Sequence, residues 1–281
     1  MAQTPPVVLT IAGFDPSSGA GATADIKTIA AHGCYGMAAL TALTVQSTSG
    51  VRRCEASDPV LLRETLEELK ADSRISAVHV GMLASDKVAT VVADFLESSE
   101  LPCVVLDTIV RSSSGATLLD DKGVSVLADR LIPLASVITP NAQEASLLTG
   151  TKVQTEIDMK NAAQQLQEMG AKAVVVTGGH LTPTVDVLLS PNGALQIFKS
   201  EQLAAPFTHG TGCAFSTAIA CHLAQGRPLA EAVLLAKSYL TAAITNGYPV
   251  GKGVSPVNHM YRMKNHPGGF AKAKRMTTGK D

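Results

Sequence analysis

Short runs of β-branched and aliphatic residues alternate along this chain with segments whose apolar residues recur every three or four positions. The short runs predict buried strands, and the longer segments predict amphipathic helices. The predicted strands span residues 7–12, 38–44, 77–80, 103–106, 137–139 and 173–176. The predicted helices span residues 20–31, 58–72, 85–97, 123–131, 143–148 and 158–168. This alternation favours an α/β fold in which helices cover both faces of a mainly parallel sheet.

The last third of the chain departs from this alternation. Its predicted elements are a β-hairpin over residues 185–189 and 195–200 and two long apolar helices over residues 213–224 and 229–245. The hairpin is indicated by the turn sequence Pro-Asn-Gly at 191–193. Since neither a linker nor an internal repeat interrupts the pattern, we predict a single domain over residues 1–281, ending in an exposed basic tail over about residues 262–281.

Charge and composition narrow the classes of function. The chain has 23 basic and 24 acidic residues, 4% aromatic residues and no Trp, so we expect no nucleic-acid partner. The five cysteines lack zinc-site spacing, which favours a reducing, cytoplasmic location. The first residues lack a signal-peptide pattern, and no apolar run reaches the roughly 18 residues that span a bilayer. We therefore expect no membrane partner.

Chemically suggestive residues gather at the predicted carboxyl ends of the strands. In a parallel sheet these ends share one edge, and ligands bind there. The residues at these ends are Asp15 and the glycines of GFDPSSGAG, Gln46, Gly81, Met82, Asp107, Asn141, Glu144, Thr177, Gly178, Gly179 and His180. Their convergence predicts a binding site at this edge of the sheet.

The sequence His209-Gly-Thr-Gly-Cys213 stands where a long apolar helix begins. Free backbone N–H groups and the helix dipole attract phosphate at such a point, and glycine lets the backbone approach it closely. The helix start also favours a thiolate, so we expect Cys213 to be less basic than a free thiol. Cys213 then either accepts a substrate proton or only fills space beside the glycines.

Asp107 and Glu144 are two carboxylates at predicted strand ends. Paired acids near a phosphate site commonly hold Mg²⁺, often through water. Alternatively, Asn141 and Glu144 simply begin a helix as a capping box. Spacing alone leaves both interpretations open, and the anion pocket predicted at residues 210–213 adds weight to Mg²⁺.

Other patterns carry less information. Gly19-Ala-Gly-Ala-Thr-Ala24 matches a dinucleotide-binding fingerprint, but no carboxylate follows about 20 residues later to hold a ribose. We interpret His180 and His209 as ordinary loop or half-buried histidines. The remaining four cysteines are interpreted as packing residues.

Several segments, taken together in chain order, resemble a known family. They are TIAGFDPSSGAGATADIKTIAAHGCYGMAALTALTVQST, VHVGML, VVLDTIVRSSSG, VITPNAQEASLLTG, VVVTGGHL, FTHGTGCAFSTAIA and PVNHMY. Over about residues 7–261 the chain resembles the hydroxymethylpyrimidine/phosphomethylpyrimidine kinases of thiamine biosynthesis, in the ribokinase-like superfamily. The resemblance implies a three-layer α/β/α sandwich, a homodimer, and ATP and Mg²⁺ as cofactors. It implies two successive phosphorylations, of 4-amino-5-hydroxymethyl-2-methylpyrimidine and of its monophosphate.

The resemblance also implies roles for single residues. Those implied to bind substrate are Gly13, Asp25, Val45, Gln46 and Met82, with Gln46 on the pyrimidine ring. Those implied to bind nucleotide phosphates are Asp107, Asn141, Glu144, Thr177 and Gly179, with Asp107 and Glu144 as the Mg²⁺ ligands. The implied anion hole is Gly210, Thr211 and Gly212, followed by Cys213 where the superfamily's sugar kinases carry an aspartate base.

Two residues depart from the family pattern. Thr177 replaces a lysine, which removes a cation from the phosphates unless another residue such as Lys252 supplies it. Thr108 replaces a proline. The competing functions are a pyridoxal or pyridoxine kinase, a pyrimidine-binding homologue without activity, and a cysteine hydrolase that pairs Cys213 with His209.

Overall fold

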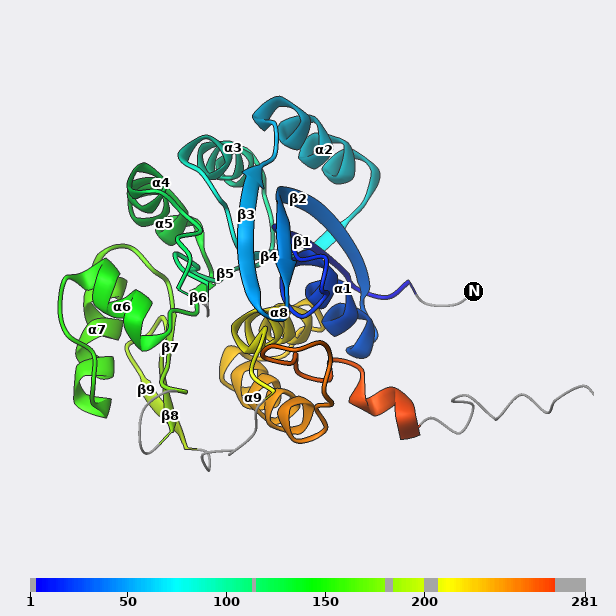
Figure 1. The fold of residues 1–281 in the computed structure, drawn as a ribbon. Helices are drawn as coiled ribbons and strands as arrows, with labels where there is room; N and C mark the ends of the chain where they lie inside the picture. The colour runs from blue at the N-terminus through cyan, green and yellow to red at the C-terminus, as the bar shows by residue number, and fades with distance from the viewer. Residues whose placement is uncertain (1–3, 113–114, 180–183, 200–206, 266–281) are drawn as a thin grey trace, which may run out of the picture.

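The computed structural model describes residues 4–112, 115–179, 184–199 and 207–265. The described strands form one sheet in the order β3-β2-β1-β4-β5-β6-β7-β8-β9 (Figure 1). They are β1 (Val7–Phe14), β2 (Tyr35–Ser47), β3 (Gly50–Ala56), β4 (Ile75–Val80), β5 (Val104–Leu106), β6 (Val137–Ile138), β7 (Val174–Thr177), β8 (Val185–Leu189) and β9 (Leu195–Lys199). The six strands from β2 to β7 in this order run parallel, while β3 pairs antiparallel with β2 at one edge and β8 and β9 add two antiparallel pairings at the other. The predicted α/β fold is confirmed.

Helices cover both faces of this sheet (Figure 1). The helices are α1 (Gly21–Ala31), α2 (Pro59–Asp72), α3 (Asp86–Glu97), α4 (Asp121–Val126), α5 (Ile132–Leu134), α6 (Ala142–Thr149), α7 (Glu156–Glu168), α8 (Thr211–Ala224) and α9 (Leu229–Thr245). One apolar core packs the sheet against α2 to α7, and a second packs it against α1, α8 and α9. Because side chains alternate along a strand, Val8 of β1 enters the second core and Leu9 enters the first. The result is a three-layer α/β/α sandwich.

The sequence analysis missed strand β3 and made β2 too short. The segment Gly50–Ala56 carries two arginines and a glutamate, so it has no buried apolar face to mark it as a strand. Its backbone pairing with β2 from Ala42 to Ser47 is what makes it extended. The pairing of β2 with β1 ends at Leu43, so residues 44–47 belong to a hairpin that continues past the parallel sheet.

Two predicted helices also begin or continue differently. Helix α8 begins at Thr211 instead of residue 213, after Gly210 with φ of 81°. The helix predicted over residues 123–131 starts at Asp121 and passes through a π-helical turn, Leu127–Leu131, into α5. The π turn ends two residues before Pro133, which has no N–H to continue a regular ladder.

The end of the chain is described only in part. Residues 261–265 form a 3₁₀ turn in which Arg262 and Met263 are exposed, and the Arg262 guanidinium lies 5.7 Å from the ring centre of Tyr239. Residues 266–281 of that tail, His180, and residue 200 of the predicted hairpin lie outside the described residues. No helix within the described ranges is both long and apolar enough to cross a bilayer.

Candidate active site

The loop after β5 and the start of α6 bring two carboxylates to one edge of the sheet. Asp107 is 4% exposed and Glu144 is 9% exposed. The Glu144 carboxylate accepts hydrogen bonds from the Asn141 N–H (3.0 Å) and the Thr108 hydroxyl (3.3 Å). The Asn141 side chain in turn accepts from the Glu144 N–H (2.9 Å). The capping-box interpretation is therefore confirmed, and the same box holds Glu144 beside Asp107.

Burial makes both carboxyl groups reluctant to ionise. It raises the pKa of Asp107 to about 6, although the positive charge of His79 and a hydrogen bond from Ser216 oppose the shift. Burial and the charge of Asp107 raise the pKa of Glu144 to about 8. Two adjacent carboxylates of this kind are stabilised together by a cation.

The donor set fits Mg²⁺ only in part. Among the described residues, no three His, Cys, Asp or Glu side chains are grouped so that they could hold a metal ion. Mg²⁺ commonly keeps several waters and takes one or two carboxylates plus substrate phosphates. Asp107 and Glu144 supply that number of protein ligands.

The turn before α8 lies beside this acidic pair. A Cβ added to Gly212 would lie 3.7 Å from Oδ2 of Asp107. At Gly210 an added Cβ would lie 2.9 Å from the carbonyl carbon of Gly19 and still closer to its oxygen. The first N–H groups of α8 therefore lie between the acidic pair and the loop that carries Gly19. Only glycine fits at position 210, because its φ is positive and the Gly19 carbonyl group leaves no room for a Cβ.

Cys213, in the first turn of α8, does not have the ionisation that the sequence predicted. Burial raises the pKa of its thiol well above the usual value, and the charges of Asp107 and Asp25 raise it further. A hydrogen bond from the Gly21 backbone lowers it only in part. The expectation of a stabilised thiolate is wrong, because desolvation and nearby carboxylates outweigh the helix dipole. The side chain is a neutral thiol at pH 7.

A second cluster surrounds Gln46 in the extension of β2. The Gln46 amide nitrogen lies 3.4 Å from Nε2 of His209, and its oxygen accepts a hydrogen bond from the Thr44 hydroxyl (3.2 Å). Nε2 of His209 also lies 2.9 Å from Oδ2 of Asp15. Burial alone would raise the pKa of Asp15, but hydrogen bonds from His209 and Ser17 lower it overall.

His209 is half-buried, as predicted, but it also belongs to the candidate site, which the sequence analysis did not predict. It connects the loop of Asp15 with Gln46 and directly precedes the turn at Gly210. Its place immediately before Gly-Thr-Gly-Cys was the signal that could have found it. Its partners lie 194 and 163 residues away in sequence, so only the folded chain shows them.

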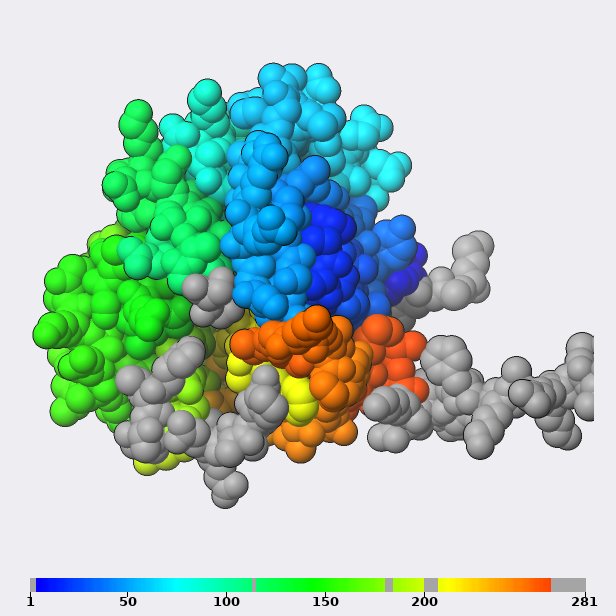
Figure 2. Space-filling model, viewed as in Figure 1, coloured from blue at the N-terminus to red at the C-terminus, as the bar shows by residue number. Residues whose placement is uncertain are grey.

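Of the apolar residues predicted near the substrate, Val45 precedes Gln46 in β2 and Met82 follows β4. Met82 is 8% exposed, and any side chain at Gly13 would collide with its thioether. Val45 is 52% exposed, and a β-bulge between Val45 and Gln46 interrupts the usual alternation of side chains. A hollow of about 460 Å³ lies between the β2–β3 turn and Gly115. Figure 2 shows the orange segment around residue 250 packed against the blue strands of this hairpin.

Asp25 does not face this hollow. It is completely buried, and its two carboxylate oxygens accept hydrogen bonds from the hydroxyls of Thr10 (2.7 Å) and Thr217 (2.9 Å). The predicted substrate contact is therefore wrong for this conformation. Asp25 instead lies in the core between α1, β1 and α8.

The end of β7 shows what surrounds Thr177. Thr177 lies opposite Asp186 of β8, and Asp186 forms a buried ion pair with Lys237 of α9. The other oxygen of Asp186 accepts a hydrogen bond from the Gly178 N–H (3.1 Å). An ammonium group is thus present near this loop but is bound to Asp186. A Cβ added to Gly179 would have no atom within 4 Å, so this position is open.

Lys252, the other cation that the sequence suggested for the phosphates, lies beside the β2–β3 turn. The neighbouring Gly253 donates its N–H to the Thr48 hydroxyl (3.0 Å) at the β2–β3 turn. Strand β2 is separated from β7 by four other strands of the sheet, so Lys252 and Thr177 belong to different parts of the sheet edge.

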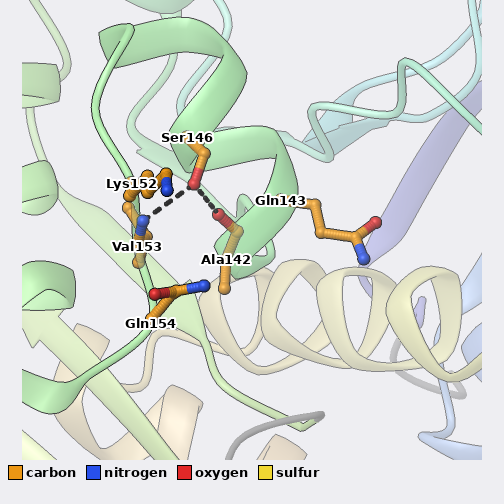
Figure 3. Close-up of a pocket in the computed structure, with 6 residues that line it drawn as sticks. All are labelled: Ala142, Gln143, Ser146, Lys152, Val153 and Gln154. Atoms are coloured by element: carbon orange, nitrogen blue, oxygen red, sulfur yellow. Dashed lines mark hydrogen bonds between the residues drawn. The ribbon is translucent and has the colours of Figure 1, made fainter.

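A cavity of about 310 Å³ lies beside the start of α6 (Figure 3). It is lined by Ala142, Gln143, Ser146, Lys152, Val153 and Gln154. The Ser146 hydroxyl donates to the Ala142 carbonyl (2.8 Å) and accepts from the Val153 N–H (3.0 Å). Because no predicted site residue lines this cavity, the candidate active site is the edge formed by Gln46, Asp107 and Gly210.

Sequence comparisons show which proteins this chain is similar to. A family model described as phosphomethylpyrimidine kinase matches residues 15–258. A hydroxymethylpyrimidine/phosphomethylpyrimidine kinase of Haemophilus influenzae is 40% identical over 257 residues, which cover 90% of this chain and 96% of that protein. The thiamine biosynthesis bifunctional protein ThiED of Geobacter sulfurreducens is 43% identical, and the match covers 90% of this chain and 52% of that longer protein.

Solved structures agree with these relatives. The pyridoxal kinase of Bacillus subtilis, solved as an ADP complex, has a TM-score of 0.85 at 34% identity, covering 93% of this chain and 100% of that one. A phosphomethylpyrimidine kinase from Clostridium difficile has a TM-score of 0.77 at 38% identity, covering 85% and 99%. Fold, matched range and relatives agree, and this chain belongs to the phosphomethylpyrimidine kinase family of phosphotransferases, with a ribokinase-like fold.

Proposed function

We propose that residues 1–281 act as one kinase domain that uses ATP to phosphorylate 4-amino-5-hydroxymethyl-2-methylpyrimidine and then its monophosphate, for thiamine diphosphate biosynthesis. The observation that carries the proposal is the position of the Gly210–Gly212 turn. It lies between a pair of buried carboxylates and the Gln46 cluster. A substrate hydroxyl held near Gln46 and a phosphate held by the turn would therefore meet.

Each group of site residues would have a separate role in phosphoryl transfer. The reaction needs alignment and charge stabilisation more than covalent chemistry. The N–H groups at the start of α8 would bind the transferred phosphate, and Gln46 would hold the ring between Val45 and Met82. Asp107 and Glu144 would hold Mg²⁺, which when bound neutralises phosphate charge. Asn141, Thr177 and Gly179 border the nucleotide side.

The direct test incubates the purified protein with Mg·ATP and the free pyrimidine. We expect mass spectrometry to detect the monophosphate and then the diphosphate. Folded protein that forms neither product contradicts the proposal, and formation of the monophosphate alone limits it to the first step.

Gln46→Leu should weaken binding of the pyrimidine and leave binding of ATP unchanged. The side-chain amide offers a donor and an acceptor, which suits a ring nitrogen beside an amino group. Losing these bonds costs about 1–3 kcal/mol if buried groups stay unpaired. The measurement is KM for each substrate, and an equal rise in both KM values would place Gln46 outside the substrate pocket.

A pyridoxal kinase is the second candidate, since the Bacillus subtilis pyridoxal kinase shares 34% of its sequence with this chain. Pyridoxal also carries a hydroxymethyl group on an aromatic nitrogen ring. Comparing kcat/KM for pyridoxal and for the pyrimidine separates the two functions. A higher value for pyridoxal would replace the first proposal with the second.

Mg²⁺ should stabilise the protein more at pH 8.5 than at pH 5.5. The folded pKa values of about 6 for Asp107 and about 8 for Glu144 lie above the usual values, so the fold favours the protonated groups. Without metal, their contribution to stability is therefore lost as pH rises from about 4 to 8. Mg²⁺ binds the ionised pair and offsets that loss. The measurement is the Mg²⁺-induced rise in Tm at each pH.

Substituting Asp107 and Glu144 provides the control for the Mg²⁺-induced rise in Tm. Asp107→Asn and Glu144→Gln should both flatten the metal-free pH profile and abolish most of the Mg²⁺-induced rise in Tm. A rise in Tm that is unchanged in both variants would assign the metal to other residues.

We propose further that the chain forms a homodimer through β2. This strand exposes large apolar side chains, including Tyr35 at 59% and Leu43 at 55%. Light scattering should give twice the chain mass, and Leu43→Asp should shift it towards the monomer. A monomeric parent protein would overturn the dimer.

We also propose a cytoplasmic location, which the five free cysteines support, because a reducing compartment keeps thiols free.

A further inference from the structure

A chain of polar side chains crosses the core between the sheet and α8. Its members, in spatial order, are Asp25, Thr10, His79, Ser216 and Asp107. The side chains around it are apolar, among them Val8, Ala77, Val105, Ala214 and Ala218. Burying polar groups is costly unless each has a partner, and every link of this chain has one. The chain ends at Asp107 in the candidate active site.

The hydrogen bonds at the inner end place a proton on Nδ1 of His79. The Thr10 hydroxyl donates to Asp25 (2.7 Å), and its oxygen lies 3.1 Å from Nδ1 of His79. Since that hydroxyl has only one proton, its oxygen accepts from Nδ1–H. The Asp25 carboxylate lies 3.4 Å from the same nitrogen.

The outer end places a second proton on Nε2. The Ser216 oxygen lies 2.9 Å from Nε2 of His79, 3.2 Å from Oδ2 of Asp107 and 3.0 Å from the Gly212 carbonyl oxygen. An ionised carboxylate only accepts hydrogen bonds, whereas Nε2 of a protonated ring donates, so both neighbours of Ser216 are satisfied when its proton goes to Asp107. Its oxygen then accepts from Nε2–H. With both nitrogens protonated, His79 is an imidazolium.

The electrostatics agree with this proton count. Burial alone would lower the pKa of His79, but the charge of Asp25 and a hydrogen bond to it raise the pKa overall, and Asp107 adds to the rise. A neutral His79 protonated on Nδ1 would take the Ser216 proton for itself. Asp107 would then lose its hydrogen bond from Ser216.

We propose that His79 is a positioning residue for phosphoryl transfer, which orients Asp107 beside the Gly210–Gly212 turn through the hydroxyl of Ser216. The proposal rests on the function proposed above. His79 touches neither substrate nor nucleotide in it. The residue links β4 and α8 to the loop after β5, so the anion turn and the carboxylate keep a fixed separation.

The activity test compares two neighbouring hydroxyls of α8. Ser216→Ala removes the link to Asp107, and Thr217→Val removes a buried hydroxyl that bonds Asp25 instead. Both should lower Tm. Only Ser216→Ala should lower kcat, by about 10–100-fold as for other side chains that orient a metal or catalytic ligand. KM for the pyrimidine should stay within a few-fold of the parent. Equal kcat values for the two variants would overturn the proposal.

A spectroscopic measurement tests the inference without activity. The ring ¹⁵N shifts of His79 should show both nitrogens protonated at pH 7 in the parent protein, with a changed Nε2 signal in Ser216→Ala and an unchanged one in Thr217→Val. A neutral ring in the parent would overturn the inference even if the kinase is active. Conversely, a protonated ring in a protein without kinase activity would contradict only the proposed function.

Discussion

Gly210→Ala should abolish most kinase activity and destabilise the protein by several kcal/mol. Gly210 has a φ of 81°, where an L-residue costs about 1–2 kcal/mol. Its new Cβ would also press on the Gly19 carbonyl, which is backbone and cannot rotate away, and such overpacking costs about 1–3 kcal/mol more. Displacing the turn by about 1 Å from the phosphate would cost about 10²-fold in rate. Tm and kcat report the two effects.

Gly150→Ala is the matched control. Gly150 ends α6 with a φ of 70°, but no atom lies within 4 Å of an added Cβ. This variant should lose only about 1–2 kcal/mol and keep its kcat. If Gly210→Ala were as active and as stable as Gly150→Ala, close contact between the two glycine loops would not matter for the site.

Cys213→Ala should lower kcat by roughly 10²–10⁴, the range for loss of a positioned proton acceptor. The raised pKa of the thiol changes the pH profile that accompanies this role. Only the small thiolate fraction accepts a proton at neutral pH, so kcat of the parent should increase with pH beyond neutrality. Cys213→Ala should lack this increase, while KM for both substrates stays near normal. Steady-state kinetics from pH 6 to 9 provide the test.

The competing interpretation of Cys213 makes a different prediction. If the side chain only fills space, Cys213→Ala retains kcat within a few-fold of the parent at every pH. The N–H groups at the start of α8 would then stabilise the transferred phosphate without a side-chain base.

The order of most elements and the position of several candidate site residues were predictable from local sequence. The β-branched runs and the helical segments between them predicted the parallel sheet, because burial on both faces makes a strand a short continuous apolar run, while a helix buried on one face has apolar residues every three or four positions. Asp107 and Glu144 could be placed at one edge because parallel strands share their carboxyl ends. The helix-capping pattern of Asn141 and Glu144 was likewise local, since its two hydrogen bonds join residues three apart.

The sequence by itself thus determined the fold class, the edge of the sheet that carries the candidate site and the family resemblance. Only the tertiary structure decided which polar residues meet. Strand β3 is extended because of its neighbour, Asp25 lies in the core and His209 in the site, and His79 reaches Asp107 through a residue 137 positions away. The ionisation of side chains was also decided by the tertiary structure, since the pKa of Cys213 depends on burial and on carboxylates from three other segments. Periodicity and capping act within one segment, whereas desolvation and charge act through space.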